Sequence, residues 1–297
     1  SPMKQTRLPL IARSFAKLNL YLKVLNKRKD KFHNLSTLFC RIDLADTIKF
    51  KGRNDGLIKI RCDDSQVPGD KTNLCWQAAE LLKRDFNLNY GIDIVINKRI
   101  PVGAGLGGGS SNAACVLSSL NRYWKLDLPA EKLARLGAKI GSDVAFFIYN
   151  TKFAEAGGRG EKIKPIIPLK KLDLYFVLIY PKIKVSTPLI YQRFDNFSRL
   201  TRPTCNVKML TSELSKKGQG FDPDCLFNNL EIVAESLYPG IKQVKKAFSS
   251  IGLEKIMMSG SGSSVFSLCD SYNQAKNLSS RLSKEHKSWQ VFVTRAV

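Results

Sequence analysis

Hydrophobic and polar residues alternate near the start of the chain in a way that predicts β-strands. Residues 11–25 alternate in part: between Lys17 and Leu22 a leucine falls at every second position, the period-two pattern of a strand. Runs of the same kind predict further strands, the first three of them in an antiparallel sheet, at 35–43, 48–50, 57–62 and 91–96.

Apolar residues spaced three and four apart predict helices in the middle of the chain. These helices cover 73–86, the segment after Asn112 and 131–136, and an apolar run follows at 144–149. Further on, the patterns predict helices at 188–194 and 241–251 and strands at 174–180, 255–258 and 263–268. The mixture is typical of an α+β protein rather than of regular βαβ alternation. A proline-rich stretch at 165–169 predicts a domain boundary.

Composition describes an ordinary globular protein with an unusual charge. Of the 297 residues, 43% are hydrophobic and 25% are charged, which excludes disorder over most of the length. No apolar run reaches the roughly 18 residues that a membrane-spanning helix needs. Lys and Arg number 48 against 25 acidic residues, a net charge of +23. This surplus attracts anions, whether nucleic acid, anionic lipid or phosphorylated metabolite, and does not choose among them.

Cysteine and histidine usage narrows the chemistry. The seven cysteines include no C-x-x-C pair, so we expect neither a disulfide framework nor a zinc site and predict reduced thiols. The only histidines are His33 and His286. Any catalysis is therefore expected to depend mainly on Lys, Asp, Ser and backbone groups.

The most unusual segment follows the predicted strand at 91–96. Five glycines occur within residues 103–109, directly before Ser110, Ser111 and Asn112. A dinucleotide site is disfavoured because no second strand ending in an acidic residue follows, and a P-loop because Ser110 stands where its lysine is needed. Backbone N–H groups without side chains can still approach phosphate oxygens, and the dipole of the following helix adds positive potential. We therefore predict a phosphate-binding loop.

This segment resembles the phosphate loop of the GHMP kinase superfamily. Five other segments agree with the superfamily in the same order, at 16–20, 30–33, 140–144, 158–161 and 259–262. The resemblance thus covers nearly the whole chain. It implies a two-domain α+β GHMP kinase fold with the active site in the cleft between the domains. Residues 1–165 would form a ribosomal-protein-S5-like α/β domain with the ATP loop, and residues 166–297 a ferredoxin-like α+β domain completing the substrate site.

The segments at 30–33 and 140–144 are most similar to one branch of the superfamily. Its members phosphorylate the 2-hydroxyl of 4-diphosphocytidyl-2-C-methyl-D-erythritol in the non-mevalonate (methylerythritol phosphate) isoprenoid pathway. The resemblance implies ATP as co-substrate, Mg²⁺ carried with ATP, a small-molecule substrate, and neither nucleic acid nor membrane as partner. It leaves a monomer or a weak homodimer open. The implied location is the bacterial cytoplasm, or the plastid stroma if a transit peptide was removed.

Matching motifs make Asp143 the expected catalytic base and Lys17 its cationic partner. A tertiary alcohol is a poor nucleophile, so its proton must leave as the new phosphorus–oxygen bond forms. An aspartate beside a lysine can accept that proton because the cation keeps the carboxylate ionised. Without the resemblance, the local pattern would make Asp143 a helix cap and Lys17 an exposed strand lysine.

The resemblance also implies binding residues. Those for ATP are Lys98, Pro101, Val102, Gly103, Ala104, Gly105, Leu106, Gly107, Gly108, Gly109, Ser110 and Ser111. Those for the substrate are Asn19, Phe32, His33, Thr187 and Tyr191. Phe32 is expected to stack on the cytosine and His33 to hydrogen-bond its polar edge. The family usually has Tyr where this chain has Phe32, so a role for a phenol hydroxyl is lost. The turn at 259–262 is expected to support the pocket.

Two alternatives stay open at the level of sequence. One is another GHMP kinase, acting on a sugar, homoserine or a mevalonate derivative. The other is a basic nucleic-acid-binding protein, which the charge of +23 permits. The chain shows no RNP-like motif, aromatic repeat or basic helix register that would support this second alternative.

Overall fold

The computed structural model describes residues 9–197, 202–217 and 221–297. These residues belong to two compact units. Unit 1 contains the chain up to Ala16, Leu44–Val102 and Gly107–Asn150, and unit 2 contains Lys17–Asp43, Gly103–Leu106 and Thr151–Val297. Two long strands, β1 (Leu10–Lys27) and β2 (His33–Arg53), contribute residues to both units. Each unit is therefore discontinuous in sequence, and the division into 1–165 and 166–297 stays a prediction.

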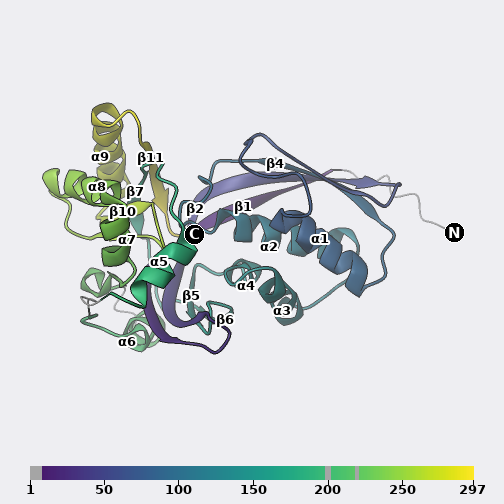
Figure 1. The fold of residues 1–297 in the computed structure, drawn as a ribbon, viewed down its shortest axis with the longest axis horizontal. Helices are drawn as coiled ribbons and strands as arrows, with labels where there is room; N and C mark the ends of the chain where they lie inside the picture. Colours follow the sequence, from purple (N-terminus) through teal and green to yellow (C-terminus); the bar gives the residue numbers. More distant parts are fainter. Residues whose placement is uncertain (1–8, 198–201, 218–220) are drawn as a thin grey trace. The chain divides into compact units, whose positions relative to one another are not determined.

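Unit 1 combines strands with four helices, which lie together on one side of β4 (Figure 1). Its elements are parts of β1 and β2, β3 (Ile58–Cys62), α1 (Leu74–Asp85), β4 (Gly91–Asn97), α2 (Gly108–Tyr123), α3 (Ala130–Ile140) and α4 (Val144–Ile148). Strand β4 pairs antiparallel with β2 and parallel with β3. The prediction that 57–62 joins an antiparallel sheet is therefore wrong. Because α1 connects β3 to β4, the two strands run the same way, as in a βαβ crossover.

The core of unit 1 fixes the strand β4 and the start of α2. Ile92, Ile94 and Ile96 of β4 are fully buried, and so is the predicted apolar face of α2, with Ala113, Val116, Leu117 and Leu120. Helix α1 packs along α2. It begins at Asn73, whose Oδ1 accepts a hydrogen bond from the Cys75 N–H at 2.8 Å, a standard N-cap. The start of α2 thus follows a buried strand and belongs to a buried helix.

Unit 2 contains a four-stranded antiparallel sheet in the order β11-β7-β10-β9. The strands are β7 (Tyr175–Tyr180), β9 (Ile256–Met258), β10 (Val265–Cys269) and β11 (Gln290–Arg295), and the helices of this part are α5 (Thr187–Phe194), α7 (Glu231–Leu237), α8 (Pro239–Ser250) and α9 (Tyr272–Glu285). Apolar side chains from strands and helices share one core, among them Val177, Ile179, Val244 and Phe248. The turn between β9 and β10, which contains the second glycine motif, leaves the sheet from this core.

The rest of unit 2 surrounds the strand that carries Lys17. Strand β5 (Phe153–Gly157) pairs with β2, and β6 (Lys162–Ile166) pairs with β5. Strand β8 (Phe227–Asn228) lies parallel to β1, with Phe227 opposite Tyr21 and Asn228 opposite Leu22. Helix α6 (Val207–Ser212), the π-helical turn η1 (Glu213–Lys217) and the 3₁₀ turn η2 (Pro223–Cys225) complete the unit. Residues from late in the chain are thereby placed beside β1.

One pair of cysteines departs from the sequence prediction. Cys205 and Cys225 form a disulfide, so the prediction that all seven thiols are reduced is wrong for this pair. The two residues are 20 positions apart without a recognisable motif, and the segments around α6 and η2 bring their Cα atoms to 5.5 Å. The other five cysteines are free. Burial raises the pKa of the Cys40, Cys75 and Cys115 thiols, that of Cys115 to about 11, so these three stay protonated at neutral pH.

The α+β class and most predicted elements are confirmed. The predicted strands at 35–43 and 48–50 are parts of the single strand β2, and the helix after Asn112 begins earlier, at Gly108. The sequence patterns did not reveal β5, β6, β8, α6, α7, α9 or β11. In the part of the chain that the structure describes, no helix is both long and apolar enough to cross a bilayer.

Candidate active site

Lys17 and Asn19 lie on the same face of β1 in unit 2, as their spacing predicts. Both are buried, and Lys17 Nζ donates to Asn19 Oδ1 at 2.5 Å. The Lys17 ammonium also lies 5.4 Å from the centre of the Phe39 ring. Thr37 fixes the amide, because Asn19 Nδ2 donates to Thr37 Oγ1 at 2.9 Å and the Thr37 hydroxyl donates to the Tyr21 carbonyl at 2.6 Å. Lys17 is thus a buried, oriented cation and not an exposed strand lysine.

Two glycine turns of unit 2 meet beside this lysine. The first is Gly103–Leu106, whose Leu106 carbonyl accepts from the Lys17 N–H at 3.0 Å. The second is Ser259–Gly262, whose Ser259 hydroxyl donates to the Gly105 carbonyl at 3.0 Å. Gly105 has φ +78°, and a Cβ there would collide with the Ser259 carbonyl oxygen. Only glycine fits this close approach.

The second turn also touches the Lys17–Asn19 pair. A Cβ added to Gly260, which has φ +58°, would lie 3.4 Å from Lys17 Nζ and 3.5 Å from Asn19 Oδ1. Asn228 of β8 holds the turn, since its Nδ2 donates to the Met258 and Gly260 carbonyls at 2.9 and 2.8 Å. Asn228 is buried and was missed by the sequence analysis. Its chemistry is ordinary, and only the pairing of β8 with β1 reveals its position.

Lys98 in unit 1 is part of a buried polar network centred on Asp46. The Lys98 ammonium lies 2.5 Å from Asp46 Oδ2, and the exposed fractions of the two side chains are 6% and 0%. Asp46 also accepts from the Arg99 and Ile100 N–H groups at 2.7 and 2.9 Å and from Asn112 Nδ2 at 2.9 Å. The Asp46 carboxylate on β2 therefore bonds both to residues 98–100, which precede the glycine loop, and to the second turn of α2. Asp46 was not predicted as a site residue.

The start of α2 has the properties expected of an anion site. Its N-cap is Gly107, with φ +71°, so no side chain caps the helix and no acidic residue occupies the first turn. Such a turn presents backbone N–H groups and a positive dipole end. A Cβ at Gly109 would meet only a Leu74 methyl group at 3.8 Å, whereas one at Gly108 would lie 3.2 Å from Lys98 Nζ. Gly108 is therefore required for packing, and the absence of a side chain at Gly109 leaves space at the start of the helix.

Ser111 and Asn112, which follow these glycines, point into unit 1. Ser111 is buried, and its hydroxyl lies 2.7 Å from Ser14 Oγ. Asn112 Nδ2 donates to the same Ser14 hydroxyl at 2.9 Å. These side chains anchor the helix to β1. The start of α2 is therefore held in place. Close to it on the chain are the remaining residues predicted to bind ATP, Pro101, Val102, Ala104 and Ser110.

Asp143 directly precedes α4 in unit 1. It occupies the N-cap position of that helix, but its side chain makes no cap hydrogen bond. Helix capping therefore does not account for the carboxylate. Its role as the catalytic base stays a prediction.

The predicted cytidine residues of unit 2 form an aromatic cluster with a carboxylate. The His33 ring stacks on Tyr191 at 5.2 Å between ring centres, and His33 Nε2 lies 2.6 Å from Asp195 Oδ1. Asp195, at the end of α5, also binds Lys27. Hydrogen bonds from Lys27 and then from His33 hold the pKa of Asp195 below its usual value. Asp195 was missed because a helix-end aspartate is usually an ordinary solvated residue.

Phe32 and Thr187 lie in different surroundings within unit 2. Phe32 is 53% exposed, and its ring carries the Arg159 guanidinium 4.9 Å from the ring centre. The Thr187 hydroxyl lies 2.7 Å from the Ser261 hydroxyl of the glycine turn. The structure therefore brings His33 and Tyr191 together, and separately brings Thr187 to the turn beside Lys17.

Comparisons with known proteins identify the family to which the chain belongs. The family described as GHMP kinases N terminal domain matches residues 73–151, and GHMP kinases C terminal matches residues 213–288. A homoserine kinase structure from Cytophaga hutchinsonii, 19% identical, covers 99% of this chain and 96% of its own with a TM-score of 0.71. The fold and its two glycine turns define a GHMP kinase.

Closer relatives narrow the class. A 4-diphosphocytidyl-2-C-methyl-D-erythritol kinase of Bacillus velezensis is 41% identical over 261 residues, 87% of this chain and 88% of the relative. The kinase of the same name from Shouchella clausii is 39% identical over 265 residues, with 89% and 86% covered. A crystal structure of a 4-(cytidine 5'-diphospho)-2C-methyl-D-erythritol kinase, 31% identical, covers 97% of this chain and 100% of its own with a TM-score of 0.77. The chain belongs to the 4-diphosphocytidyl-2-C-methyl-D-erythritol kinase family, and the resemblance seen in the sequence is confirmed.

Proposed function

We propose that this protein transfers the γ-phosphoryl group of ATP to the 2-hydroxyl of 4-diphosphocytidyl-2-C-methyl-D-erythritol, giving the 2-phosphate and ADP. The observation that carries the proposal is the buried Lys17 ammonium, oriented by Asn19 beside Gly260, in a chain of this kinase family. A cation held rigidly and away from bulk water interacts strongly with charge that develops during phosphoryl transfer. The product would enter isoprenoid precursor synthesis.

In this proposal Asp143 accepts the proton of the 2-hydroxyl, and Lys17 stabilises the alkoxide and the transferring phosphoryl group. The start of α2 and the glycine loop bind the ATP phosphates through backbone N–H groups. Lys98 stabilises this loop together with Asp46. Mg²⁺ enters as the complex with ATP and keeps most of its waters. His33 and Tyr191 bind the cytosine end, and Thr187 and Asn19 bind nearer to the reacting hydroxyl.

The first experiment measures ADP release from ATP and Mg²⁺ with 4-diphosphocytidyl-2-C-methyl-D-erythritol. Methylerythritol phosphate, galactose, homoserine and mevalonate are run in parallel. Turnover with the cytidylated substrate alone is expected, because the proposal assigns His33 and Tyr191 to a base that the other compounds lack. Turnover with one of the others in its place would keep the kinase class and refute the proposed substrate.

A second experiment tests the two catalytic assignments. Asp143→Asn and Lys17→Met are each expected to lower kcat by about 10²–10⁴-fold, the usual contribution of general acid–base and charge stabilisation. ATP binding, measured by calorimetry, is expected to change little. Lys49→Met, an exposed lysine of β2, is the matched control and should retain kcat. A near-normal kcat in either active-site variant would remove that residue from the mechanism.

Compartment and assembly are part of the same proposal. We propose a monomer or weak homodimer of the bacterial cytoplasm, with the plastid stroma as the alternative. The Cys205–Cys225 disulfide is relevant to the compartment, because disulfides are rare in cytosolic proteins. Thiol alkylation in cell lysate followed by mass spectrometry measures how much of the pair is oxidised. A fully oxidised pair would argue against a reducing compartment.

A further inference from the structure

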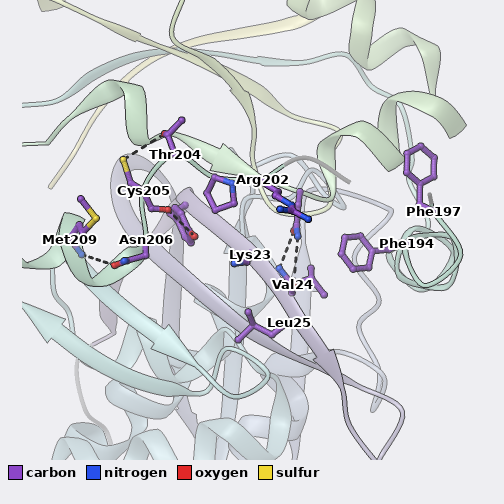
Figure 2. Close-up of a pocket in the computed structure, with 13 residues that line it drawn as sticks. Lys23, Val24, Leu25, Phe194, Phe197, Arg202, Thr204, Cys205, Asn206 and Met209 are labelled. Atoms are coloured by element: carbon purple, nitrogen blue, oxygen red, sulfur yellow. Dashed lines mark hydrogen bonds between the residues drawn. The ribbon is translucent and has the colours of Figure 1, made fainter. Parts of the chain in front are cut away.

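Unit 2 contains a cavity outside the residues assigned to the reaction. Its volume is about 800 Å³, and its walls come from β1, the end of α5 and the segment 202–209. Figure 2 shows Lys23, Val24 and Leu25 on β1, with Arg202 and the segment through Met209 alongside. None of Lys17, Asn19, His33, Thr187 or Tyr191 lines it. The volume is within the usual range of about 300–1,000 Å³ for small-molecule sites.

Among the described residues, the charged side chains that line the cavity are both positive. Its lining includes Lys23 and Arg202 and no acidic residue. Among the residues that the structure describes, neither cation has a salt-bridge partner, whereas Lys27, four positions along the same strand, pairs with Asp195. Two cations that line one cavity produce a local positive potential that favours a bound anion.

The neutral part of the lining is mostly apolar or already engaged in hydrogen bonds. Phe197 supplies partly exposed aromatic surface, whereas Tyr21 and Phe194 form buried parts of the wall, with 1% and 7% of their surface exposed. The Asn229 amide is bonded to the backbone of Val24, and Asn206 caps α6 by accepting from the Met209 N–H. These amides are therefore committed to the fold. What the cavity offers a ligand is aromatic surface together with two positive charges.

The wall that carries Arg202 is anchored at several points. Cys205 is joined to Cys225 by the disulfide, and its carbonyl accepts from the Tyr21 hydroxyl at 3.4 Å. The Thr204 hydroxyl donates to the Asp224 carbonyl at 3.3 Å. These contacts hold the segment beside β1. Thr204 and Cys205, close to Arg202 on the chain, are thus held beside β1, and a wall that is already ordered reduces the cost of binding.

We propose that this cavity is a second ligand site, which binds a small anionic molecule with a flat apolar body. The anion lies between Lys23 and Arg202, and the flat body packs against Phe197 and the exposed apolar side chains of the wall. The site shares no residue with the reaction assigned to Lys17 and Asp143, and its wall residue Phe194 meets the His33 ring edge-on, 6.3 Å between ring centres. A ligand there can occupy the protein whether or not the kinase substrate is bound.

The test uses two probes that differ only by a sulfonate group. 8-Anilinonaphthalene-1-sulfonate carries the anion, and N-phenyl-1-naphthylamine has the same rings without it. Fluorescence titration measures the Kd of each for the wild type, Lys23→Gln, Arg202→Gln and the double variant. Lys287→Gln, which removes an exposed lysine elsewhere in unit 2, is the matched control. Melting temperatures establish that each variant is folded.

The sulfonate is expected to bind about three- to fivefold more weakly to each single variant and about tenfold more weakly to the double variant. Lys287→Gln and all titrations with the neutral probe should stay within about twofold of the wild type. An unchanged sulfonate Kd in the double variant overturns the proposal, and so does a parallel loss of the neutral probe. If a glutamine variant fails to fold, Lys23→Arg and Arg202→Lys replace it and must retain sulfonate binding.

Discussion

Asp46 in unit 1 and Asp195 in unit 2 each hold a predicted binding residue, in different surroundings. Asp46 is fully buried and accepts from four donors, among them Lys98. The Asp195 side chain is 23% exposed and is shared between buried His33 and Lys27, which is 54% exposed. The Asp46 carboxylate is buried and fully hydrogen-bonded, whereas the Asp195 carboxylate is accessible to solvent and salt.

This difference in burial means that an ion pair formed by an aspartate can either stabilise a unit or orient a binding residue. A buried ion pair contributes little net stability, but removal of one partner is costly because the other charge stays desolvated. Breaking a half-exposed ion pair lowers the stability of the protein only a little, because water replaces the missing partner. Asp46 therefore acts mainly on the stability of unit 1. Asp195 acts mainly on how His33 is oriented.

The largest effect is expected for Asp46→Ala. It leaves the Lys98 ammonium buried without its carboxylate and two backbone N–H groups without an acceptor, so unit 1 should lose about 3–5 kcal/mol of unfolding free energy. Urea denaturation measures this loss. Asp46→Asn, which retains the shape and one acceptor oxygen, should lose less.

The control for this prediction is Asp93→Ala on β4. Asp93 pairs with Arg53 at 2.7 Å, but both side chains are partly exposed, so the loss should be much smaller. Equal losses for Asp46→Ala and Asp93→Ala would show that enclosure is not what distinguishes these carboxylates.

The sequence could predict one member of each pair but not the other. Lys98 and His33 fall in motifs that resemble the family, so their candidate roles could be carried over. Asp46 precedes Lys98 by 52 positions, and Asp195 follows His33 by 162 positions. Nothing local marks either aspartate, because the relevant spacing exists only after β2, β4 and α5 have packed. Asn228 was missed for the same reason.

A buried face made some elements predictable but not all, since β5 was missed although Phe153, Ala154 and Ala156 are buried. Helix α2 and strand β4 show clear periodicity because their apolar faces are in the core. Strand β8 has only two residues, too few for any period. Lys162 and Lys164 are exposed on β6, and Pro165 interrupts its pattern. The parallel pairing of β3 depends on the crossover through α1, which the strand pattern alone does not contain.

A smaller effect is expected for Asp195→Ala, and it should appear in binding rather than folding. Without the carboxylate, His33 loses one orienting hydrogen bond, which corresponds to about 1 kcal/mol. KM for 4-diphosphocytidyl-2-C-methyl-D-erythritol should rise about fivefold while kcat and the KM for ATP stay within about twofold. Steady-state kinetics measures both, and Asp195→Asn should restore part of the affinity. A fall in kcat at unchanged KM would contradict a role in substrate orientation.

The pH dependence of stability tests the hydrogen bonds of Asp195. Hydrogen bonds from Lys27 and His33 lower the pKa of Asp195 in the folded protein, while the unfolded value is about 3.9. Because the folded pKa is the lower one, the stabilisation is fully present above the unfolded pKa and is lost as the pH falls through the folded pKa. The gap in unfolding free energy between the wild type and Asp195→Asn should therefore shrink below about pH 4. Urea denaturation from pH 6 to pH 3 measures it, and a gap that widens on acidification would reverse the assignment.

The smallest effect is expected for Lys27→Gln, at the exposed end of the same pair. Because water already surrounds more than half of the Lys27 side chain, its removal should cost about 0.5 kcal/mol or less. The loss should vanish in 1 M salt, where the screening length falls to about 3 Å. The KM for the cytidylated substrate should stay within about twofold, since His33 keeps its own bond to Asp195. If Lys27→Gln instead raised KM as much as Asp195→Ala does, the lysine and not the carboxylate would be the group that orients this end of the site.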